Sequence, residues 1–369
     1  MIRRAAPVPF LLLAGVLAGC RCPFAPVGGP GVPVPDTLFA GSGTRPVAAD
    51  PRERRLRNLR QVTFEGENAE AYWSHDGTRL VFQHRGEGIP ADQIYTMSIE
   101  GTDLRLVSTG TGKTTCSYFL PGDDRVLFAS THAASPDPPT PPDMSRGYVW
   151  PIYADYDLFV AGPGPGEPVP LAPAPGYDAE AVVSPDGRRI AFTSMRSGDL
   201  DVWTMALDGS DLRQVTDEEG YDGGPFFSPD SRRLVYRSWR PGTPAESADY
   251  RGLLAQGVIR PLALQIRLCD ADGSNKRQVT DNGRANFGPY FFPDGERIIF
   301  SSNLDDPKGR EFDLYMIRAD GTGLERITFA PEFDGFPMFS PDGKTLAFCS
   351  NRHGAKRGET NVFLADWVE

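Results

Sequence analysis

One phrase recurs along this chain of 369 residues. Residues 177–187 read YDAEAVVSPDG, residues 221–231 read YDGGPFFSPDS, and residues 333–343 read FDGFPMFSPDG. With the Pro of S-P-D-G as anchor, related positions follow at spacings of 46, 64, 44, 64 and 48 residues: His75, Pro121, Pro185, Pro229, Pro293 and Pro341. Periods of this size are typical of repeat architectures, so we expect six structural units, two of them enlarged by about twenty residues.

Each unit carries the same order of expected strands. An apolar triplet ending in an aromatic residue begins five residues after the anchor, as in Leu80–Phe82 and Leu234–Tyr236, and indicates a strand buried on both faces. A second apolar run follows, then an Asp-Gly turn, then an outer strand such as LRQVT at 212–216. Asp-Gly between two such runs is a strong hairpin signal. Each unit therefore predicts a four-stranded antiparallel sheet, and six of them predict an all-β fold, a six-bladed β-propeller.

The last unit, which ends in NVFLADWVE, lacks an outer strand. The phrase LRQVT also occurs at residues 59–63, ahead of the first unit. We expect this N-terminal segment to complete the last blade, because a ring joined by both ends of the domain leaves no open edge between the first and last blades.

The repeated phrase resembles that of the TolB-like propeller family, whose units also carry a WD-like arrangement. The matching pieces are FSPDG-x-x-(I/L)-x-F, then D-(V/L)-(W/Y)-x-M, then DGS-x-x-RQVT, and they cover about residues 58–369. The family includes a periplasmic member of the Tol–Pal envelope system and non-catalytic domains of serine peptidases. Ahead of the propeller we expect no counterpart of the α/β domain that precedes the propeller of TolB.

The N-terminus resembles a bacterial lipoprotein signal. Residues 1–19 combine two arginines, a short apolar run and Leu-Ala-Gly directly before Cys20, so we expect Cys20 to be lipidated. An ordinary signal peptide is the alternative. The expected location is the bacterial cell envelope, on the periplasmic or cell-surface side. The other cysteines show no metal-binding spacing, and both free thiols and disulfides remain open.

Residues 20–57 are rich in Pro and Gly and predict a tether to the propeller of residues 58–369. A basic stretch, PRERRLRNLR at 51–60, closes the tether and predicts either a solvated or loosely docked segment or a membrane-surface contact. The net charge of −11 argues against a nucleic-acid partner. We expect a monomer.

Two large insertions, residues 132–156 and 240–263, fall between the second and third strands of the second and fourth units. Smaller ones at 304–311 and 353–360 occupy the same place in the fifth and sixth units. All four should lie on one face of the disc. Loops on a rigid scaffold commonly carry function, so this face is the expected functional one.

A polar residue stands seven positions before every anchor, where the innermost strand begins. We expect a ring of these residues at the mouth of the axial channel, with Glu70 and Glu180 two positions farther in: Asn68, Thr114, Asp178, Asp222, Asn286 and Asp334. Either they cap tight turns, or they bind a cation or a basic or hydroxylated ligand. No cofactor is expected, although oxygen ligands of this kind also suit a divalent cation.

Two further polar sets flank the ring. The first, near the ends of the second strands, is Arg85, His132, Arg196, Arg240 and Arg352. The second, ahead of the third strands, is Gln93, Asp157, Asp201, Gln265, Asp313 and Asn361. The arginines either pair with acids of neighbouring blades or face a pocket and grip a carboxylate or phosphate.

The sequence carries no G-x-S-x-G elbow, no H-E-x-x-H motif and no P-loop. We therefore expect a non-catalytic scaffold that binds an envelope protein, a peptide or a small ligand. The alternatives are a propeller enzyme, a sugar or peptide lyase or hydrolase that uses acids such as Glu70 and Glu180, or an accessory subunit of a peptidase.

Overall fold

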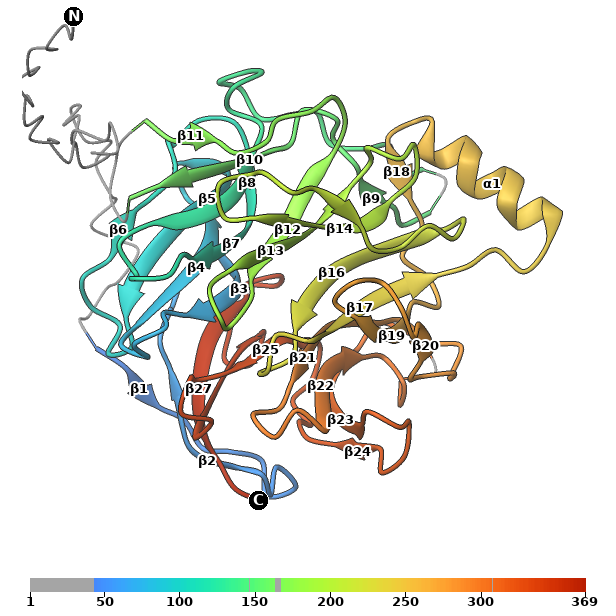
Figure 1. The fold of residues 1–369 in the computed structure, drawn as a ribbon. Coiled ribbons are helices and arrows are strands. Elements are labelled where there is room, and N and C mark those ends of the chain that lie inside the picture. The colour runs from blue at the N-terminus through green and yellow to red at the C-terminus, as the bar shows by residue number, and fades with distance from the viewer. Residues whose placement is uncertain (1–42, 146, 163–166, 307) are drawn as a thin grey trace, which may run out of the picture.

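The computed structural model describes residues 43–145, 147–162, 167–306 and 308–369. Six of its antiparallel sheets are blades arranged around one axis, which confirms the predicted six-bladed β-propeller (Figure 1). The predicted signal, Cys20 and Cys22 lie outside the described residues.

Each blade runs from the axis to the periphery through the strands that the repeat predicts. Blade 1 contains β3 (Glu67–Trp73), β4 (Arg79–Gly86), β5 (Ile89–Ser98) and β6 (Arg105–Leu106). Blade 2 contains β7 (Thr114–Phe119), β8 (Val126–Ser130), β10 (Asp157–Ala161) and β11 (Val169–Pro170). Blade 3 contains β12 (Asp178–Val183), β13 (Arg189–Ser194), β14 (Asp201–Ala206) and β15 (Arg213–Gln214). Blade 4 contains β16 (Tyr221–Phe227), β17 (Arg233–Trp239), β19 (Gln265–Asp270) and β20 (Arg277–Gln278). Blade 5 contains β21 (Asn286–Phe291), β22 (Arg297–Ser302), β23 (Asp313–Arg318) and β24 (Glu325–Arg326). Blade 6 contains β25 (Asp334–Phe339), β26 (Thr345–Ser350) and β27 (Asn361–Trp367).

The ring closes through the N-terminal segment. Strand β2 (Leu56–Gln61) pairs antiparallel with β27, so it supplies the fourth strand of blade 6 as predicted. Strand β1 (Arg45–Pro46) adds a short fifth strand outside it. Both ends of the domain are thereby built into one sheet, and the first and last blades have no open edge between them.

The anchor turn owes its repetition to a local hydrogen-bond pattern. The Ser184 hydroxyl donates to Asp186 Oδ1 at 2.6 Å and accepts the Arg189 amide at 2.9 Å. The same Ser–Asp hydrogen bond occurs in the turns of blades 1, 4 and 6: Ser74–Asp76, Ser228–Asp230 and Ser340–Asp342. Gly187, which follows the Asp, has a φ of 68°, a conformation that favours glycine.

The Thr of RQVT also has a structural reason. Thr216 Oγ1 donates to Asp201 Oδ1 at 3.0 Å and accepts the Val202 amide at 2.9 Å. It thus ties the fourth strand to the polar residue that opens the third strand. Equivalent hydroxyl contacts tie three other blades in the same way: Ser108–Gln93, Thr280–Gln265 and Thr63–Asn361.

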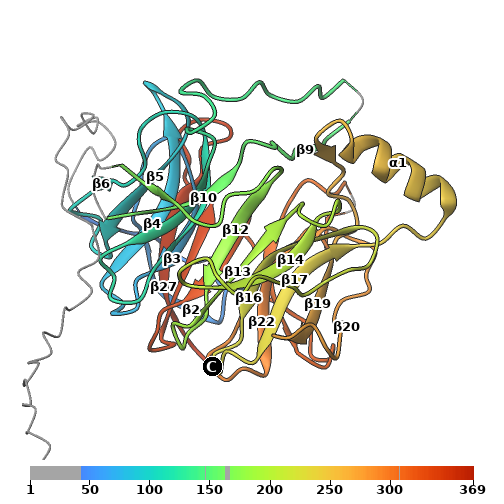
Figure 2. The same ribbon diagram turned by 45° about the horizontal axis from the view of Figure 1, so that its top comes forward.

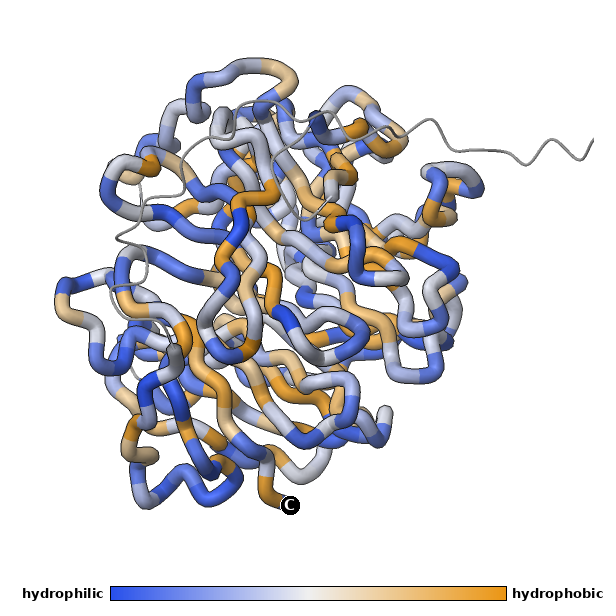
Figure 3. Tube along the Cα trace, turned by 90° about the vertical axis from the view of Figure 1, so that its left-hand side faces the viewer, coloured by the Kyte–Doolittle hydropathy of each residue, from blue (hydrophilic) through white to orange (hydrophobic). Residues whose placement is uncertain are grey.

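The hydrophobic core lies between the blades, as strands apolar on both faces require. In Figure 3 the apolar segments concentrate along strands inside the disc, and hydrophilic segments mark many of the turns. The helix α1 (Pro244–Leu254) was not expected; it begins after Thr243, whose side chain accepts the Glu246 amide, in a T-P-A-E capping-box sequence.

The closure predicts different effects for two leucines that occupy the same position of LRQVT. Leu59 is buried beside Val47 in the core of blades 5 and 6, whereas Leu212 is 40% exposed. We expect Leu59→Ala to lower the free energy of unfolding by about 2–5 kcal/mol and Leu212→Ala by less than about 0.5 kcal/mol, measured by urea denaturation. Equal losses would contradict the closure through β2.

Candidate functional site

The six inner strands share a β-bulge near their insertion-side ends. Each shifts register shortly after its first residue, as between Ala179 and Val182 in blade 3. The residue two positions after the polar ring has a left-handed φ between 47° and 59° in every blade: Glu70, Cys116, Glu180, Gly224, Gly288 and Phe336. A side chain in this conformation costs roughly 1–2 kcal/mol, and bulges of this kind re-aim side chains at functional sites.

All six bulge residues line one small cavity on the propeller axis, together with Tyr72, Phe226 and Arg237. We call it the axial chamber. Its volume is about 20 Å³, enough for roughly one water-sized group. Four bulge residues carry side chains, namely Glu70, Cys116, Glu180 and Phe336, and all four keep partial exposure. The chamber therefore offers a mixed acidic, thiol and aromatic lining to whatever enters along the axis.

Glu180 is fully engaged within the protein. Its carboxylate forms an ion pair with Arg237 and accepts Thr193 Oγ1 at 2.6 Å and the Gly224 amide at 2.8 Å. Arg237 Nε in turn donates to the Tyr221 hydroxyl at 2.7 Å. This network holds Glu180 as the internal counter-ion of Arg237.

Glu70, by contrast, has spare bonding capacity. Its Oε2 is enclosed and has no hydrogen-bond partner among the described residues. Burial raises the pKa of Glu70 to about 7, and a hydrogen bond with Cys116 offsets only part of this rise. Burial also raises the pKa of the Cys116 thiol well above its usual value. Near neutral pH the Glu70 carboxyl is therefore divided between its protonated and ionised forms.

Aromatic residues close the floor of the axial chamber. Tyr72 lies 6.0 Å from Tyr118 and 5.5 Å from Phe226, and Phe226 lies 5.3 Å from Tyr290, all between ring centroids. Below this layer a separate cavity of about 430 Å³ opens among the anchor turns and is lined largely by aromatic and proline side chains, Trp73 and Pro341 among them. The expected axial channel is thus divided into a small upper chamber, which carries Glu70, Glu180 and Arg237, and a larger lower bowl.

The two large insertions meet at the side of the chamber. Strand β9 (Trp150–Pro151) of the first pairs with β18 (Val258–Ile259) of the second, and Figure 2 shows β9 beside α1 on one side of the disc. The Trp150 ring lies 5.0 Å from the Arg237 guanidinium, which links this pair of strands to the wall of the chamber. The second insertion also reaches blade 3, where the Tyr250 hydroxyl donates to Asp199 at 2.5 Å.

The predicted polar ring lies outside the axial chamber. Its six members are 0–2% exposed and engage internal partners. Arg196 donates to Asp178 at 2.5 Å, Arg240 to Asp222 at 2.6 Å and Arg352 to Asp334 at 2.9 Å. The other three contact backbone carbonyls: Asn68 with Glu65, Thr114 with Asp92, and Asn286 with Leu264. A ligand role for the ring stays a prediction, whereas Glu70 and Glu180 do reach the chamber.

The prediction that the flanking arginines pair with acids of neighbouring blades is wrong for Arg196, Arg240 and Arg352. Each arginine follows the second strand of its own blade and pairs with the acid that begins the first strand, because these positions face each other in the sheet, as Asp178 and Ser194 do. Arg352 also pairs with the buried Glu53 of the N-terminal segment at 2.9 Å. These ion pairs therefore cross-link the scaffold.

The remaining flanking residues lie near the surface or on the sheet. Arg85 pairs with Glu67 at 2.5 Å, and both side chains are exposed. The His132 ring packs on Phe159 with centroids 4.4 Å apart. Among the third-strand positions, Asp313 pairs with Arg326 at 2.6 Å and Asp157 accepts the Ala174 amide. No group of three or more His, Cys, Asp or Glu side chains within the described ranges could hold a metal ion.

Sequence reasoning missed Cys116 and Arg237 as residues of the site. Cys116 occupies the repeat position of Glu70 and Glu180, so aligning the units at that position would have found it. Arg237 carried no such signal, because the second strand has a different residue at this position in the other blades, for example Gln83, Thr193 and Ser301.

No protein-family model and no curated protein matches the sequence. Solved structures do. A protein from Agrobacterium tumefaciens described as a TolB has a TM-score of 0.55 at 19% identity, over 83% of this chain and 92% of that chain. TolB from Acinetobacter baumannii has a TM-score of 0.56 at 16% identity, over 79% and 65%. An oligogalacturonate lyase in complex with manganese has a TM-score of 0.53 at 15% identity, over 90% and 99%.

These likenesses confirm a TolB-like propeller fold. At identities of 15–19% they show the fold alone. The function must therefore be argued from the residues of the site.

The protonation of Glu70 predicts a pH effect on stability. The folded protein holds this proton up to about pH 7, whereas an unperturbed glutamate releases it near 4.5. Between these values the folded state binds more protons, so stability falls as pH rises. We expect wild type to lose about 2–3 kcal/mol more than Glu70→Gln between about pH 5 and pH 8, measured by urea denaturation.

The exposed Glu87 provides the matched control, because Glu87→Gln makes the same chemical change at the surface. It should follow the pH profile of wild type. A Glu70→Gln profile parallel to wild type would show that Glu70 titrates as an ordinary surface acid.

Proposed function

We propose that this protein is a non-catalytic binding scaffold of the bacterial cell envelope that takes a protein, peptide or small ligand at the insertion face. The observation that carries the proposal is the enclosed, unpartnered Oε2 of Glu70 in the axial chamber. An unpartnered buried acceptor is costly unless a donor reaches it. Because the neighbouring Glu180 is already neutralised by Arg237, Glu70 is the group left to engage a ligand.

The charge and the size of the axial chamber determine which chemical group of a ligand can enter it. A cationic donor suits a carboxylate enclosed in this way, and ion-assisted hydrogen bonds are the stronger ones. The volume of about 20 Å³ admits only a group of roughly the size of an ammonium. We therefore propose a ligand that inserts a primary amine, such as a lysine side chain, while its remainder lies on the insertion face near Trp150.

The location in the envelope is part of the proposal and rests on the sequence. The signal of residues 1–19 and lipidation at Cys20 would tether a monomeric propeller to a membrane on its periplasmic or cell-surface side. No helix within the described ranges is long and apolar enough to cross a membrane. The fold shared with TolB proteins is compatible with a partner in the envelope.

A second candidate is an enzyme acting on a sugar or a peptide. The observation that favours it is the Glu70 pKa of about 7, because a carboxyl that titrates near neutral pH suits general acid–base catalysis. An oligogalacturonate lyase shares the fold. In this reading Glu70 would move a proton on a bound substrate instead of holding a cation. An accessory role beside a peptidase would again use the insertion face for binding.

The test is binding of lysine-containing peptides before and after acetylation of the lysine, measured by calorimetry on wild type and Glu70→Gln. We expect Glu70→Gln to weaken binding by about 10- to 100-fold, acetylation to weaken it similarly, and wild-type affinity to rise with pH as Glu70 ionises. Glu87→Gln serves as the control and should bind like wild type.

Two outcomes would overturn this reading. If acetylated and free peptides bind equally to wild type, the chamber does not select an amine. If envelope oligosaccharides or peptides are turned over and Glu70→Gln abolishes the turnover, the enzyme reading replaces the scaffold.

A further inference from the structure

The outer edge of blade 6 is basic in an acidic protein. Residues 44–61, which we call the basic edge, contain six arginines and two acids, a net charge of +4 in a chain of −11. They comprise β1, β2 and the turn between them, at the periphery of the disc (Figure 1). The axial chamber contains none of these residues.

Four of these arginines have no acidic partner among the described residues: Arg45, Arg54, Arg57 and Arg60. The Arg45 guanidinium lies over the Phe64 ring. The other two pair with acids, Arg52 with Asp50 and Arg55 with Glu325. Asp366 stands opposite Arg57 in the strand register but accepts a hydrogen bond from Asn58 instead. Unneutralised positive charge therefore remains at the surface of the basic edge.

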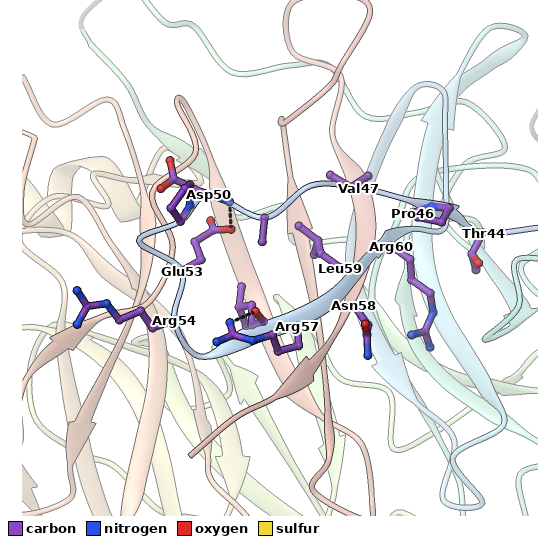
Figure 4. A pocket seen from close by; sticks show the side chains of 13 residues that line it. Thr44, Pro46, Val47, Asp50, Glu53, Arg54, Arg57, Asn58, Leu59 and Arg60 are labelled. Carbon is purple, nitrogen blue, oxygen red and sulfur yellow. Dashed lines mark hydrogen bonds between the residues drawn. The ribbon is translucent and has the colours of Figure 1, made fainter.

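The same segment forms an open groove. The chain diverges from β2 after Pro46, and the two arms of the hairpin enclose a cavity of about 640 Å³ lined by Val47, Asp50 and Arg57 among others. Figure 4 shows Arg54, Arg57 and Arg60 spread along the lower arm without converging on one point. Side chains arranged in this way suit an extended anionic surface better than a single phosphate ion.

The position of the basic edge in the chain indicates that this anionic surface is a membrane. The described chain enters the propeller here, and only residues 21–42 separate it from Cys20. Twenty-two residues span at most about 75 Å, so an anchor at Cys20 keeps the disc near the bilayer. Basic residues near an anionic bilayer surface each contribute about 1 kcal/mol to binding.

We propose that the basic edge docks on the anionic phospholipid surface of the membrane that holds the lipid anchor. The disc then stands edge-on, with Arg54, Arg57 and Arg60 toward the lipid headgroups. The insertion face and the lower bowl both remain open to partners in this orientation. The inference rests on the envelope location of the proposed function but is independent of what the axial chamber binds.

The experiment uses the chain from residue 20 onward with Cys20→Ser, so that no lipid contributes. Binding is measured by co-sedimentation with vesicles of phosphatidylcholine alone and with phosphatidylglycerol added. We expect binding only to the second, and a loss on the order of 100-fold for the triple variant Arg54→Gln, Arg57→Gln and Arg60→Gln. Inorganic phosphate should compete no better than sodium chloride of equal ionic strength.

A matched triple variant removes the same charge elsewhere: Arg188→Gln, Arg232→Gln and Lys344→Gln, all exposed in the anchor turns of blades 3, 4 and 6. It should bind phosphatidylglycerol vesicles nearly as wild type does. Equal losses of vesicle binding in the two triple variants would show that binding depends only on net charge. That result would overturn the assignment of the basic edge as the docking surface. Absence of binding by the unaltered chain would overturn membrane docking and make an acidic protein the next partner to test. Competition by phosphate above that of salt would replace the bilayer by a free anion.

Discussion

Where six strands converge on one axis, their side chains would collide unless the backbone redirects them. This steric constraint organises the whole propeller. Each inner strand meets it with a bulge two residues after its first polar residue, where the backbone turns left-handed. Glycines at two of these positions, Gly224 and Gly288, add no side chain to the axis. The other four positions carry side chains despite the backbone cost, and two of these side chains are acids. The axial chamber is the space that this arrangement leaves.

The rest of the site follows from how charge is placed around that space. Arg237, which comes from the second strand of blade 4, neutralises Glu180 but leaves the Oε2 of Glu70 without a partner. The Asp–Arg pairs of blades 3, 4 and 6 lie outside the chamber and join the first and second strands of each blade. A rigid, cross-linked wall thus surrounds one carboxyl that can still change its protonation or its partner.

The fold was predictable because its signals repeat. The anchor turn, the apolar triplet and RQVT each recur in several units, and each has a local reason, such as the Ser184–Asp186 hydrogen bond or the tie from Thr216 to Asp201. Closure was predictable from one displaced copy of LRQVT. The burial of the polar ring and the partners of its arginines were not predictable, because sequence spacing does not say whether a side chain at a strand end points to the axis or into its own sheet. Arg237 and α1 each occur in one unit only, so no repetition marked them.

The two proposals assign different parts of the disc to different tasks. The axial chamber would select a ligand by a positively charged tip, whereas the basic edge would set the orientation of the disc at the membrane. They use separate residues, so a variant in one should leave the other unchanged. An edge-on disc also leaves the insertion face clear of the bilayer, which the selection of a ligand there requires.

Ligand binding in the axial chamber depends on Glu70 being an enclosed carboxyl with a free acceptor. Infrared difference spectroscopy across a pH titration tests it most directly, because the band of a protonated carboxyl is separate from that of a carboxylate. Burial also raises the pKa of Asp313 to about 7, so the protonated band of Asp313 is present in both proteins and cancels in the difference between them. We expect wild type to show one additional protonated band, which is lost with a midpoint of about pH 7 and is missing in Glu70→Gln. Spectra of wild type and Glu70→Gln that coincide throughout the titration would contradict this expectation.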